Sequence, residues 1–182
     1  MKQIILYGVP GTGKSSIARL CAAKLEIPFY EFDLLRSKLP LEAKDPYLRM
    51  PSTLAWQLIG PLGKETAVKG FMRVRRALRP IVTRKLSDLT SDFVAEAAFV
   101  DPSIDQRGVA LIILSSKEQH YSQFFVHRTS SPEADQQFKA ARFIQDSLID
   151  EAERLRIPII DNISTAELAV ADLLRQLNFD MQ

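Results

Sequence analysis

An octapeptide near the beginning of the sequence has the residue types and the spacing that bind a polyphosphate. It reads Gly8-Val9-Pro10-Gly11-Thr12-Gly13-Lys14-Ser15 and fits the pattern G-x-x-x-x-G-K-[ST]. Glycines allow the backbone to curl until successive N–H groups face inward, and a helix that follows adds the positive end of its dipole. The pattern predicts a cradle for the phosphates of ATP, in which Lys14 reaches the β and γ phosphates and Ser15 binds Mg²⁺.

The neighbouring sequence supplies the context that such a cradle needs. An apolar run at residues 3–7 precedes it and a helical pattern begins at Lys14, so the octapeptide lies between a strand and a helix. The alternative is a glycine-rich turn that carries an exposed lysine. We expect the nucleotide to contact Gly8, Gly11, Thr12, Gly13, Lys14, Ser15 and Ser16, with Asn162 close to the base.

A second site is expected at the carboxyl end of the next predicted strand. Asp33 and Arg36 form a D-x-x-R pattern there, which we place beside the cradle in a parallel sheet. Asp33 is the candidate to orient an attacking hydroxyl or accept its proton, and Arg36 is the candidate to clamp an anionic acceptor. A helix-capping aspartate paired with an arginine three residues on would have the same spacing.

An acid near the end of a later strand is the candidate for the metal. We expect Glu96 to hold the water shell of Mg²⁺, with Asp101 as its competitor. Neither acid belongs to a full Walker B pattern, and an acid that caps a strand end through local hydrogen bonds would occupy the same position. Ser15 and Glu96 are therefore the metal ligands predicted from the sequence.

Two arginines farther along the chain are predicted to neutralise charge on the transferring phosphoryl group. Arg128 follows the aromatic run 121–125, and Arg142 lies on the long helical pattern that comes next. We place a lid at about 115–137, whose closure would exclude water from the reaction. His120 precedes the aromatic run, and a histidine in such a place is more often a surface or core residue than a catalyst.

The strongest local charge lies between Lys64 and Lys85. This stretch holds eight basic residues and one acid, which gives +7, whereas the rest of the chain sums to −5. Arg73 and Arg76, together with Arg79, are candidates to steer a phosphorylated substrate or to grip a nucleic-acid backbone. The solvated face of an amphipathic helix would give the same pattern.

Hydrophobic periodicity predicts the elements that must position these residues. Strands are expected at 3–7, 27–32, 93–100, 109–114 and 157–160. Helices are expected at 14–26, 65–86, 138–155 and 165–177, with a helical turn at 34–38 and a short helix at 52–59. This order implies an α/β fold of three layers, in which helices cover both faces of a mostly parallel, five-stranded sheet.

The combination of this fold and the cradle is typical of a small P-loop kinase. The chain has no Asn-Lys-x-Asp motif for reading guanine, and it is too short for a motor ATPase with its extra helical domain. A kinase also needs a second anion site that faces the first, because phosphoryl transfer depends mainly on positioning and charge neutralisation.

Composition indicates an ordinary folded domain. With 182 residues, 46% of them hydrophobic, we expect one domain over residues 1–182, with an insertion at about 41–63 over the acceptor site. A net charge of +2 is weak evidence for a nucleic-acid partner, and no apolar run reaches the roughly 20 residues of a membrane span. A single cysteine, Cys21, and the lack of a signal peptide predict the cytoplasm. The sequence makes no prediction of the oligomeric state.

Several segments together resemble the 2-phosphoglycerate kinases, and the resemblance extends over nearly the whole chain. Besides the octapeptide and the D-x-x-R pattern, they are Ser52-Thr53-Leu54-Ala55-Trp56, Lys117-Glu118-Gln119-His120, Phe138-Lys139-Ala140-Ala141-Arg142-Phe143-Ile144-Gln145 and Ile157-Pro158-Ile159-Ile160-Asp161-Asn162. The resemblance implies a P-loop kinase fold, ATP and Mg²⁺, and transfer of a phosphoryl group to the 3-hydroxyl of 2-phosphoglycerate.

The chain departs from that family where its pattern reads E-G-x-H before a proline. This sequence has Glu96-Ala97-Ala98-Phe99 and then Pro102, so an aromatic residue replaces a polar one. We predict an ATP-dependent kinase of a small anionic acceptor, 2-phosphoglycerate or a similar phosphorylated acid. The alternatives are a kinase of another acceptor (a nucleoside, sugar acid or antibiotic), an NTP-switched RNA-binding or regulatory protein, and a nucleotide-binding protein with an incomplete catalytic set.

Overall fold

A five-stranded sheet forms the centre of the computed structural model, which describes residues 2–39, 44–103, 108–126 and 128–179. Its strands are β1 Gln3–Tyr7, β2 Phe29–Glu31, β3 Phe93–Ala97, β4 Val109–Ile113 and β5 Ile159–Asp161. They lie in the order β2-β3-β1-β4-β5, and every neighbouring pair is parallel. The number of strands is as predicted, and the sheet is parallel throughout.

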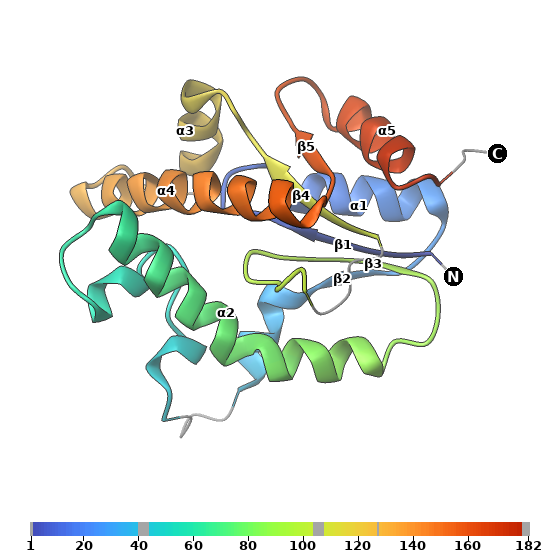
Figure 1. Ribbon diagram of the computed structural model, residues 1–182. Coiled ribbons are helices and arrows are strands. Elements are labelled where there is room, and N and C mark those ends of the chain that lie inside the picture. Colours follow the sequence, from blue (N-terminus) through green and yellow to red (C-terminus); the bar gives the residue numbers. More distant parts are fainter. Residues whose placement is uncertain (1, 40–43, 104–107, 127, 180–182) are drawn as a thin grey trace.

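Helices cover both faces of this sheet, as Figure 1 shows. One face carries α1 Lys14–Leu25 and α5 Ala166–Gln176, and the other carries α2 Lys64–Ser87 and α4 Pro132–Leu155. The shorter helical segments are α3 Lys117–Phe125 and the 3₁₀ turns η1 Phe32–Lys38, η2 Pro46–Leu48 and η3 Ala55–Leu58. This arrangement confirms the three-layer α/β/α fold.

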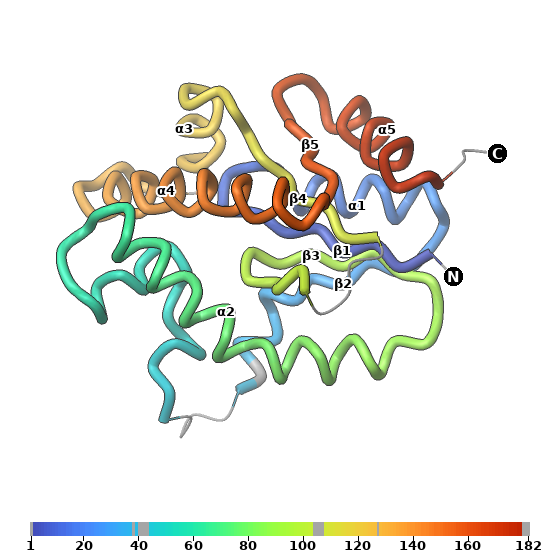
Figure 2. The backbone as a smooth tube through the Cα atoms, in the orientation of Figure 1, coloured from blue at the N-terminus to red at the C-terminus, as the bar shows by residue number. Residues whose placement is uncertain are grey.

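Two hydrophobic clusters, one on each side of the sheet, hold the layers together. Side chains alternate along a strand, so Ile4 and Leu6 of β1 face α1 and α5, whereas Ile5 and Tyr7 face α2 and α4. The backbone trace in Figure 2 shows α2 and α4 as neighbours on the second face. The apolar stripes predicted for the helices therefore lie against a sheet that is buried on both sides.

Helix α3 was not predicted from the sequence. Ser116 caps it, since its side chain accepts a hydrogen bond from the Gln119 N–H, but only His120 and Phe124 of the helix are buried. So narrow an apolar side gives a weak helical signal. Helix α4 also begins earlier than position 138, because Ser131 caps it and Pro132 suits the first turn.

The strand order corrects one expectation about the second site. β3 lies between β2 and β1, so the turn after β2 is not beside the octapeptide but one strand farther away. The carboxyl ends of the three strands still share one edge of the sheet. Hydrophobic periodicity predicts strands but cannot predict which of them pair. Here the connection from β2 to β3 passes through α2, and β3 then lies between β2 and β1 in the sheet.

The segment before α2 runs through two 3₁₀ turns, η2 and η3, that contact α2. Gly70 of α2 allows this contact, because a Cβ at that position would lie 2.6 Å from the backbone nitrogen of Trp56. The insertion predicted at 41–63 includes residues 41–43, which lie outside the described residues, and its place over an acceptor stays a prediction. No helix in the described part of the chain is both long and apolar enough to cross a membrane.

Candidate functional site

The octapeptide forms the connection from β1 to α1 at the carboxyl edge of the sheet (Figure 1). Gly11 and Gly13 have φ angles of 85° and 79°, in the left-handed region that favours glycine. Among the residues that the structure describes, the backbone N–H groups of Gly11, Gly13 and Lys14 have no hydrogen-bond partner. Free N–H groups at a helix N-terminus are what an anion site requires, so the loop has the expected form of a phosphate cradle.

Glu96 on β3 contacts both functional side chains of the cradle. Its Oε2 lies 3.3 Å from Lys14 Nζ, and its Oε1 accepts a hydrogen bond of 2.9 Å from Ser15 Oγ. β3 pairs with β1 so that Glu96 lies level with Leu6, just before the loop. Burial raises the pKa of Glu96, which is 1% exposed, whereas the charge of Lys14 lowers it and that of Asp33 raises it. The pairing of β3 with β1 thus brings together Glu96 and Ser15, the two metal ligands predicted from the sequence.

These groups fit a magnesium ion. A serine hydroxyl and a carboxylate are the oxygen ligands that Mg²⁺ prefers, and Glu96 Oε2 has only the Lys14 ammonium, at 3.3 Å, as a partner in the described part of the chain. The competing acid, Asp101, is engaged elsewhere: it accepts hydrogen bonds from Ser103 and lies 3.3 Å from Arg79 Nη1. The geometry favours Glu96 over Asp101, and its role as a metal ligand stays a prediction.

Asp33 and Arg36 lie on η1, the turn after β2. Arg36 Nη1 donates to Met50 O at 2.9 Å, and the guanidinium stacks on Phe99 with its centre 4.6 Å from the ring centroid. Burial lowers the pKa of Arg36, and the nearby charge of Asp33 raises it. Arg36 Nε is buried with no partner among the described residues. The aromatic residue that departs from the family pattern therefore supports the predicted anion clamp.

The two arginines assigned to charge neutralisation contact the protein itself in this structure. Arg128 Nη1 donates to Phe124 O at 2.6 Å, and its guanidinium lies over the Phe124 ring. Arg142 Nη1 donates to Leu114 O at 2.9 Å and lies 3.4 Å from His120 Nδ1. Both arginines lie at or near α3, which packs on the cradle. Their contact with a transferring phosphoryl group stays a prediction.

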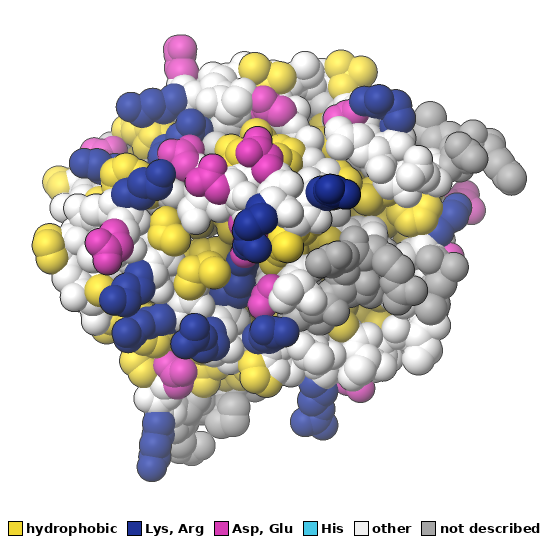
Figure 3. All heavy atoms as spheres, viewed as in Figure 1, with side chains coloured by type: hydrophobic (Ala, Val, Ile, Leu, Met, Phe, Trp, Pro, Cys, Tyr) yellow, Lys and Arg dark blue, Asp and Glu magenta, His cyan; other side chains and the backbone are white. Residues whose placement is uncertain are grey.

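Most basic residues of α2 form an exposed face, whereas Arg75 is buried. Lys and Arg side chains gather over the lower left of the molecule in Figure 3, where α2 runs in Figure 1. Arg73 donates to the Tyr47 hydroxyl at 3.1 Å, Arg79 is paired with Asp101, and Arg76 is exposed. The exposure of these side chains is what both alternatives from the sequence require, and substrate contacts of Arg73 and Arg76 stay predictions.

A cavity of about 500 Å³ lies beside the cradle, between α3 and the segment that follows β5. Gln119 and Gln123 of α3 line one side, and Asn162, Ile163 and Ser164 line the other. The lining offers both donors and acceptors. Its position agrees with the prediction of a base near Asn162, although the Asn162 side chain also donates to the loop, at 3.0 Å from Thr12 O.

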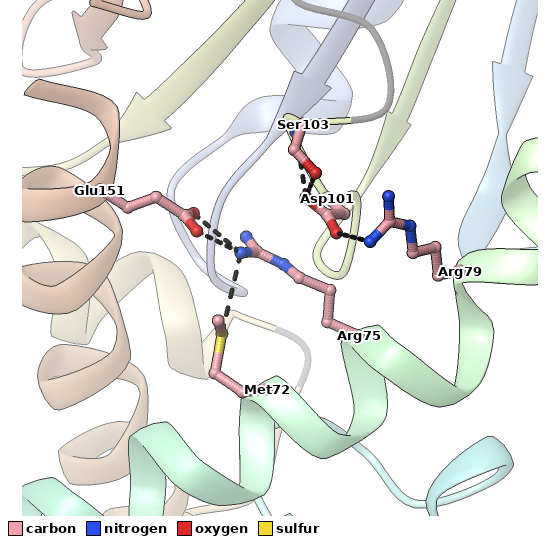
Figure 4. A network of polar contacts seen from close by, with 6 residues as sticks. All are labelled: Met72, Arg75, Arg79, Asp101, Ser103 and Glu151. Carbon is pink, nitrogen blue, oxygen red and sulfur yellow. Dashed lines mark hydrogen bonds and ion pairs between the residues drawn. The ribbon is translucent and has the colours of Figure 1, made fainter. Parts of the chain in front are cut away.

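Sequence reasoning did not identify Arg75 of α2 as a candidate. Its side chain is 3% exposed and lies between α2 and α4. Figure 4 shows its guanidinium pointing to Glu151 of α4, and Nη1 donates to both carboxylate oxygens, at 2.9 and 2.8 Å. Arg75 Nε and Nη2 and the Tyr7 hydroxyl are buried with no partner in the described ranges. The sequence did hold a signal for this burial: Arg75 follows Phe71 by four residues, so it falls on the apolar stripe of the helix.

Comparisons with known proteins agree with this geometry. Residues 4–44, from β1 past η1, match the ATPase family associated with various cellular activities (AAA). This match covers the phosphate cradle but less than a quarter of the chain. No curated protein matches the sequence.

Solved structures with the same fold cover nearly the whole chain. A gluconokinase from Sinorhizobium meliloti 1021 has 17% identity and a TM-score of 0.57 over 97% of this chain and 91% of its own. A shikimate kinase from Bacteroides thetaiotaomicron has 14% identity and a TM-score of 0.59, with coverage of 98% and 99%. A deoxyadenosine kinase from M. mycoides with bound dATP has 16% identity and a TM-score of 0.54, with coverage of 97% and 99%. The chain therefore has the P-loop kinase fold.

Proposed function

We propose that the protein is an ATP- and Mg²⁺-dependent phosphotransferase that transfers the γ-phosphoryl group to a hydroxyl of a small anionic metabolite. One observation carries this proposal: Lys14 and Ser15 of the cradle meet at Glu96 on β3, and Asp33 and Arg36 lie on the turn after β2, the other neighbour of β3. Donor and acceptor groups thus share one edge of the sheet, where ligands of open parallel sheets bind.

On the donor side, the free N–H groups of the loop would bind the β-phosphate, and Lys14 would neutralise charge on the β and γ phosphates. Ser15 and Glu96 would hold Mg²⁺, which when bound neutralises the negative charge that develops during transfer. Lys14 must then exchange its ion pair with Glu96 for the nucleotide. The base would enter the cavity lined by Gln119, Gln123 and Asn162.

On the acceptor side, Asp33 would orient the attacking hydroxyl and accept its proton, and Arg36 would bind the anionic group of the acceptor. Arg36 is suited to this task because its contact with Phe99 holds the guanidinium in place while Nε stays without a partner in the described part of the chain. A carboxylate or phosphate is the group that a guanidinium binds best. Together with the family resemblance, this supports 2-phosphoglycerate or a similar phosphorylated acid as the acceptor.

The lid and the remaining arginines complete the proposal. Arg128 and Arg142 would move from their contacts with Phe124 and Leu114 to the transferring group when the segment around α3 closes. Arg73 and Arg76 on the exposed face of α2 would attract an anionic acceptor. The single cysteine and the use of ATP favour action in the cytoplasm.

The test measures ADP release with a panel of acceptors: 2-phosphoglycerate, other phosphorylated acids, sugar acids, nucleosides and aminoglycosides. We expect one phosphorylated acid to stimulate release, and Lys14→Ala to reduce the stimulated rate at least about 100-fold, because a charge on the transferring group is lost. Lys69→Ala, an exposed lysine of α2, is the matched control. Stimulated release that survives in Lys14→Ala would refute the mechanism, and stimulation only by a nucleoside or an uncharged sugar would refute the acceptor class.

The exposed basic face of α2 favours one further candidate, an NTP-switched protein that binds RNA. Six basic residues of this helix are exposed: Lys64, Lys69, Arg73, Arg76, Arg79 and Arg84. Binding through phosphate contacts would weaken steeply with salt. Tight, salt-dependent RNA binding, together with no acceptor-stimulated ADP release, would favour this function over the kinase.

A further inference from the structure

The phosphate cradle is held from outside by two side chains that are distant in the sequence. His120 Nε2 lies 2.9 Å from Pro10 O, and Asn162 Nδ2 donates to Thr12 O at 3.0 Å. His120 comes from α3, and Asn162 directly follows β5. The two bonded carbonyls belong to the peptide groups 10–11 and 12–13, which are alternate peptide groups of the loop.

These contacts determine which way the loop N–H groups point. A trans peptide group is planar, and its C=O and N–H bonds point in opposite directions. A side chain that holds Pro10 O on the outer side of the loop therefore turns the Gly11 N–H toward the inner side. In the same way, the hydrogen bond to Thr12 O turns the Gly13 N–H inward. Both N–H groups are among those with no partner in the described residues.

We propose that His120 and Asn162 are positioning residues of the phosphate cradle, which orient the 10–11 and 12–13 peptide groups so that the N–H groups of Gly11 and Gly13 donate to phosphate. This inference rests on the proposed binding of a nucleotide at the loop. The two side chains act through the backbone, and neither needs to touch the phosphates. Without them, each peptide group could rotate and present a carbonyl oxygen, which repels an anion.

The surroundings of His120 select the tautomer that this role requires. A carbonyl oxygen only accepts, so Nε2, which faces Pro10 O, carries the hydrogen. A guanidinium only donates, so Nδ1, which lies 3.4 Å from Arg142 Nη1, presents its lone pair. Burial and the charge of Arg142 lower the pKa of His120, against the opposing effect of the bond to Pro10. The ring is therefore neutral at pH 7 and donates toward the loop.

The position of the ring is itself determined by the rest of the fold. Arg142 belongs to α4 and donates to Leu114 O at 2.9 Å, at the end of β4. The His120 ring, which is fully buried, meets Phe138 edge-on with centroids 5.1 Å apart. Before the proposed closure, the chain of contacts runs from β4 and α4 through Arg142 and His120 to Pro10, and it holds the loop while phosphate binds.

Glycine is needed at the two positions where these side chains approach the loop. A Cβ on Gly11 would lie 3.1 Å from His120 Cδ2 and 2.9 Å from Phe124 Cα. A Cβ on Gly13 would lie 2.3 Å from Asn162 Nδ2. Any side chain at either position would push the holding residue away. The close approach is thus a second reason for these glycines, in addition to their positive φ angles.

The experiment follows the amide signals of Gly11 and Gly13 by NMR in ¹⁵N-labelled full-length protein. Magnesium pyrophosphate is the first probe, because it binds the cradle and has no base, and MgADP is the second. In the unmodified protein both amide protons should shift downfield on binding, as expected for donors to phosphate. Isothermal titration gives the affinity of each probe.

Two substitutions should separate the two glycines. In His120→Phe, which keeps a ring but removes the donor, the Gly11 shift should fall while the Gly13 shift remains. In Asn162→Leu, which is close in shape, the reverse should hold. Each substitution should weaken both probes about tenfold, roughly the effect of one hydrogen bond to a charged group. His120→Gln restores an amide donor and should recover part of the Gly11 shift.

Other results would overturn the inference. If pyrophosphate binds normally to Asn162→Leu while MgADP does not, Asn162 contacts the base alone. If both glycine shifts fall together in either variant, the residue supports the fold and does not orient one peptide group. If the unmodified protein binds neither probe, the proposed function and the inference both fail, whereas normal binding to it with unchanged variants overturns the inference alone. Should His120→Phe not fold, the Asn162→Leu arm and His120→Gln still decide.

Discussion

Phe99, the aromatic residue at the position where the chain departs from the family pattern, contacts the Arg36 guanidinium. Its ring is buried and carries the Arg36 guanidinium, whose pKa is lowered by burial and raised by Asp33. Stacking leaves the edge of a guanidinium available for hydrogen bonds, and Nε has no partner in the described chain. The aromatic residue therefore fits the anion site that we propose for Arg36.

At this scale we predict that Arg36→Met raises the KM for the acceptor about 30-fold or more, equivalent to about 2 kcal/mol, and leaves the KM for ATP unchanged. Methionine retains the contact with Phe99 but loses the charge. Steady-state kinetics with the acceptor found in the panel gives both constants. Arg84→Met, at an exposed position of α2, is the control. An unchanged acceptor KM would remove Arg36 from the site.

At the scale of elements, an ion pair between buried Arg75 and partly buried Glu151 joins helices α2 and α4. Arg75 Nη1 contacts both carboxylate oxygens of Glu151, and Met72 Sδ lies 3.8 Å away (Figure 4). Two of the Arg75 nitrogens have no partner in the described ranges, so the pair does not offset the full cost of burying the charge. The pair sets how the two helices meet, whereas the net gain in stability is expected to be small.

We therefore predict that Glu151→Gln destabilises the fold by about 3–5 kcal/mol, because the buried Arg75 charge loses the carboxylate to which it donates. The double variant Arg75→Met/Glu151→Leu should recover most of this loss or exceed the stability of the unmodified protein. Urea unfolding measures both. Arg79→Ala, which breaks the more exposed pair with Asp101, should cost less than about 1 kcal/mol. A double variant as unstable as the single one would contradict this view.

At the scale of the whole molecule, the parallel sheet collects the candidate site at one edge. The loop after β1, Glu96 on β3 and the turn after β2 meet there, and α3 and the segment after β5 hold the loop from outside. A substitution that weakens the packing of α3 is therefore expected to weaken the contact between His120 and Pro10 O of the loop. The stability of the whole fold is therefore linked to the protonation of this one ring.

The sign of that linkage follows from the lowered pKa of His120. Below about pH 6.5 the unfolded chain protonates this histidine, whereas the folded chain resists protonation, so the unfolded state binds more protons. We predict that stability falls as the pH drops from 7 to 5.5, and that His120→Gln loses this part of the slope. Chemical unfolding across that range gives the difference between the two proteins. Equal slopes would show that the ring titrates freely in the fold.

The sequence alone determined the parts of the protein that depend on local pattern. The octapeptide, the apolar strands and the basic stripe of α2 could be read directly, because backbone freedom at glycine and hydrophobic periodicity are properties of short segments. Helix α3 was missed since only His120 and Phe124 of it are buried.

Only the tertiary structure decided which segments meet. It placed β3 between β1 and β2, brought Glu96 to Lys14 and Ser15, buried Arg75 against Glu151, and set His120 and Asn162 on the loop carbonyls. The residues in these contacts are far apart in the sequence: 76 positions for Arg75 and Glu151, and 150 positions for Thr12 and Asn162. The physical reason is that such contacts arise from the pairing of strands and the packing of layers, which no local pattern records.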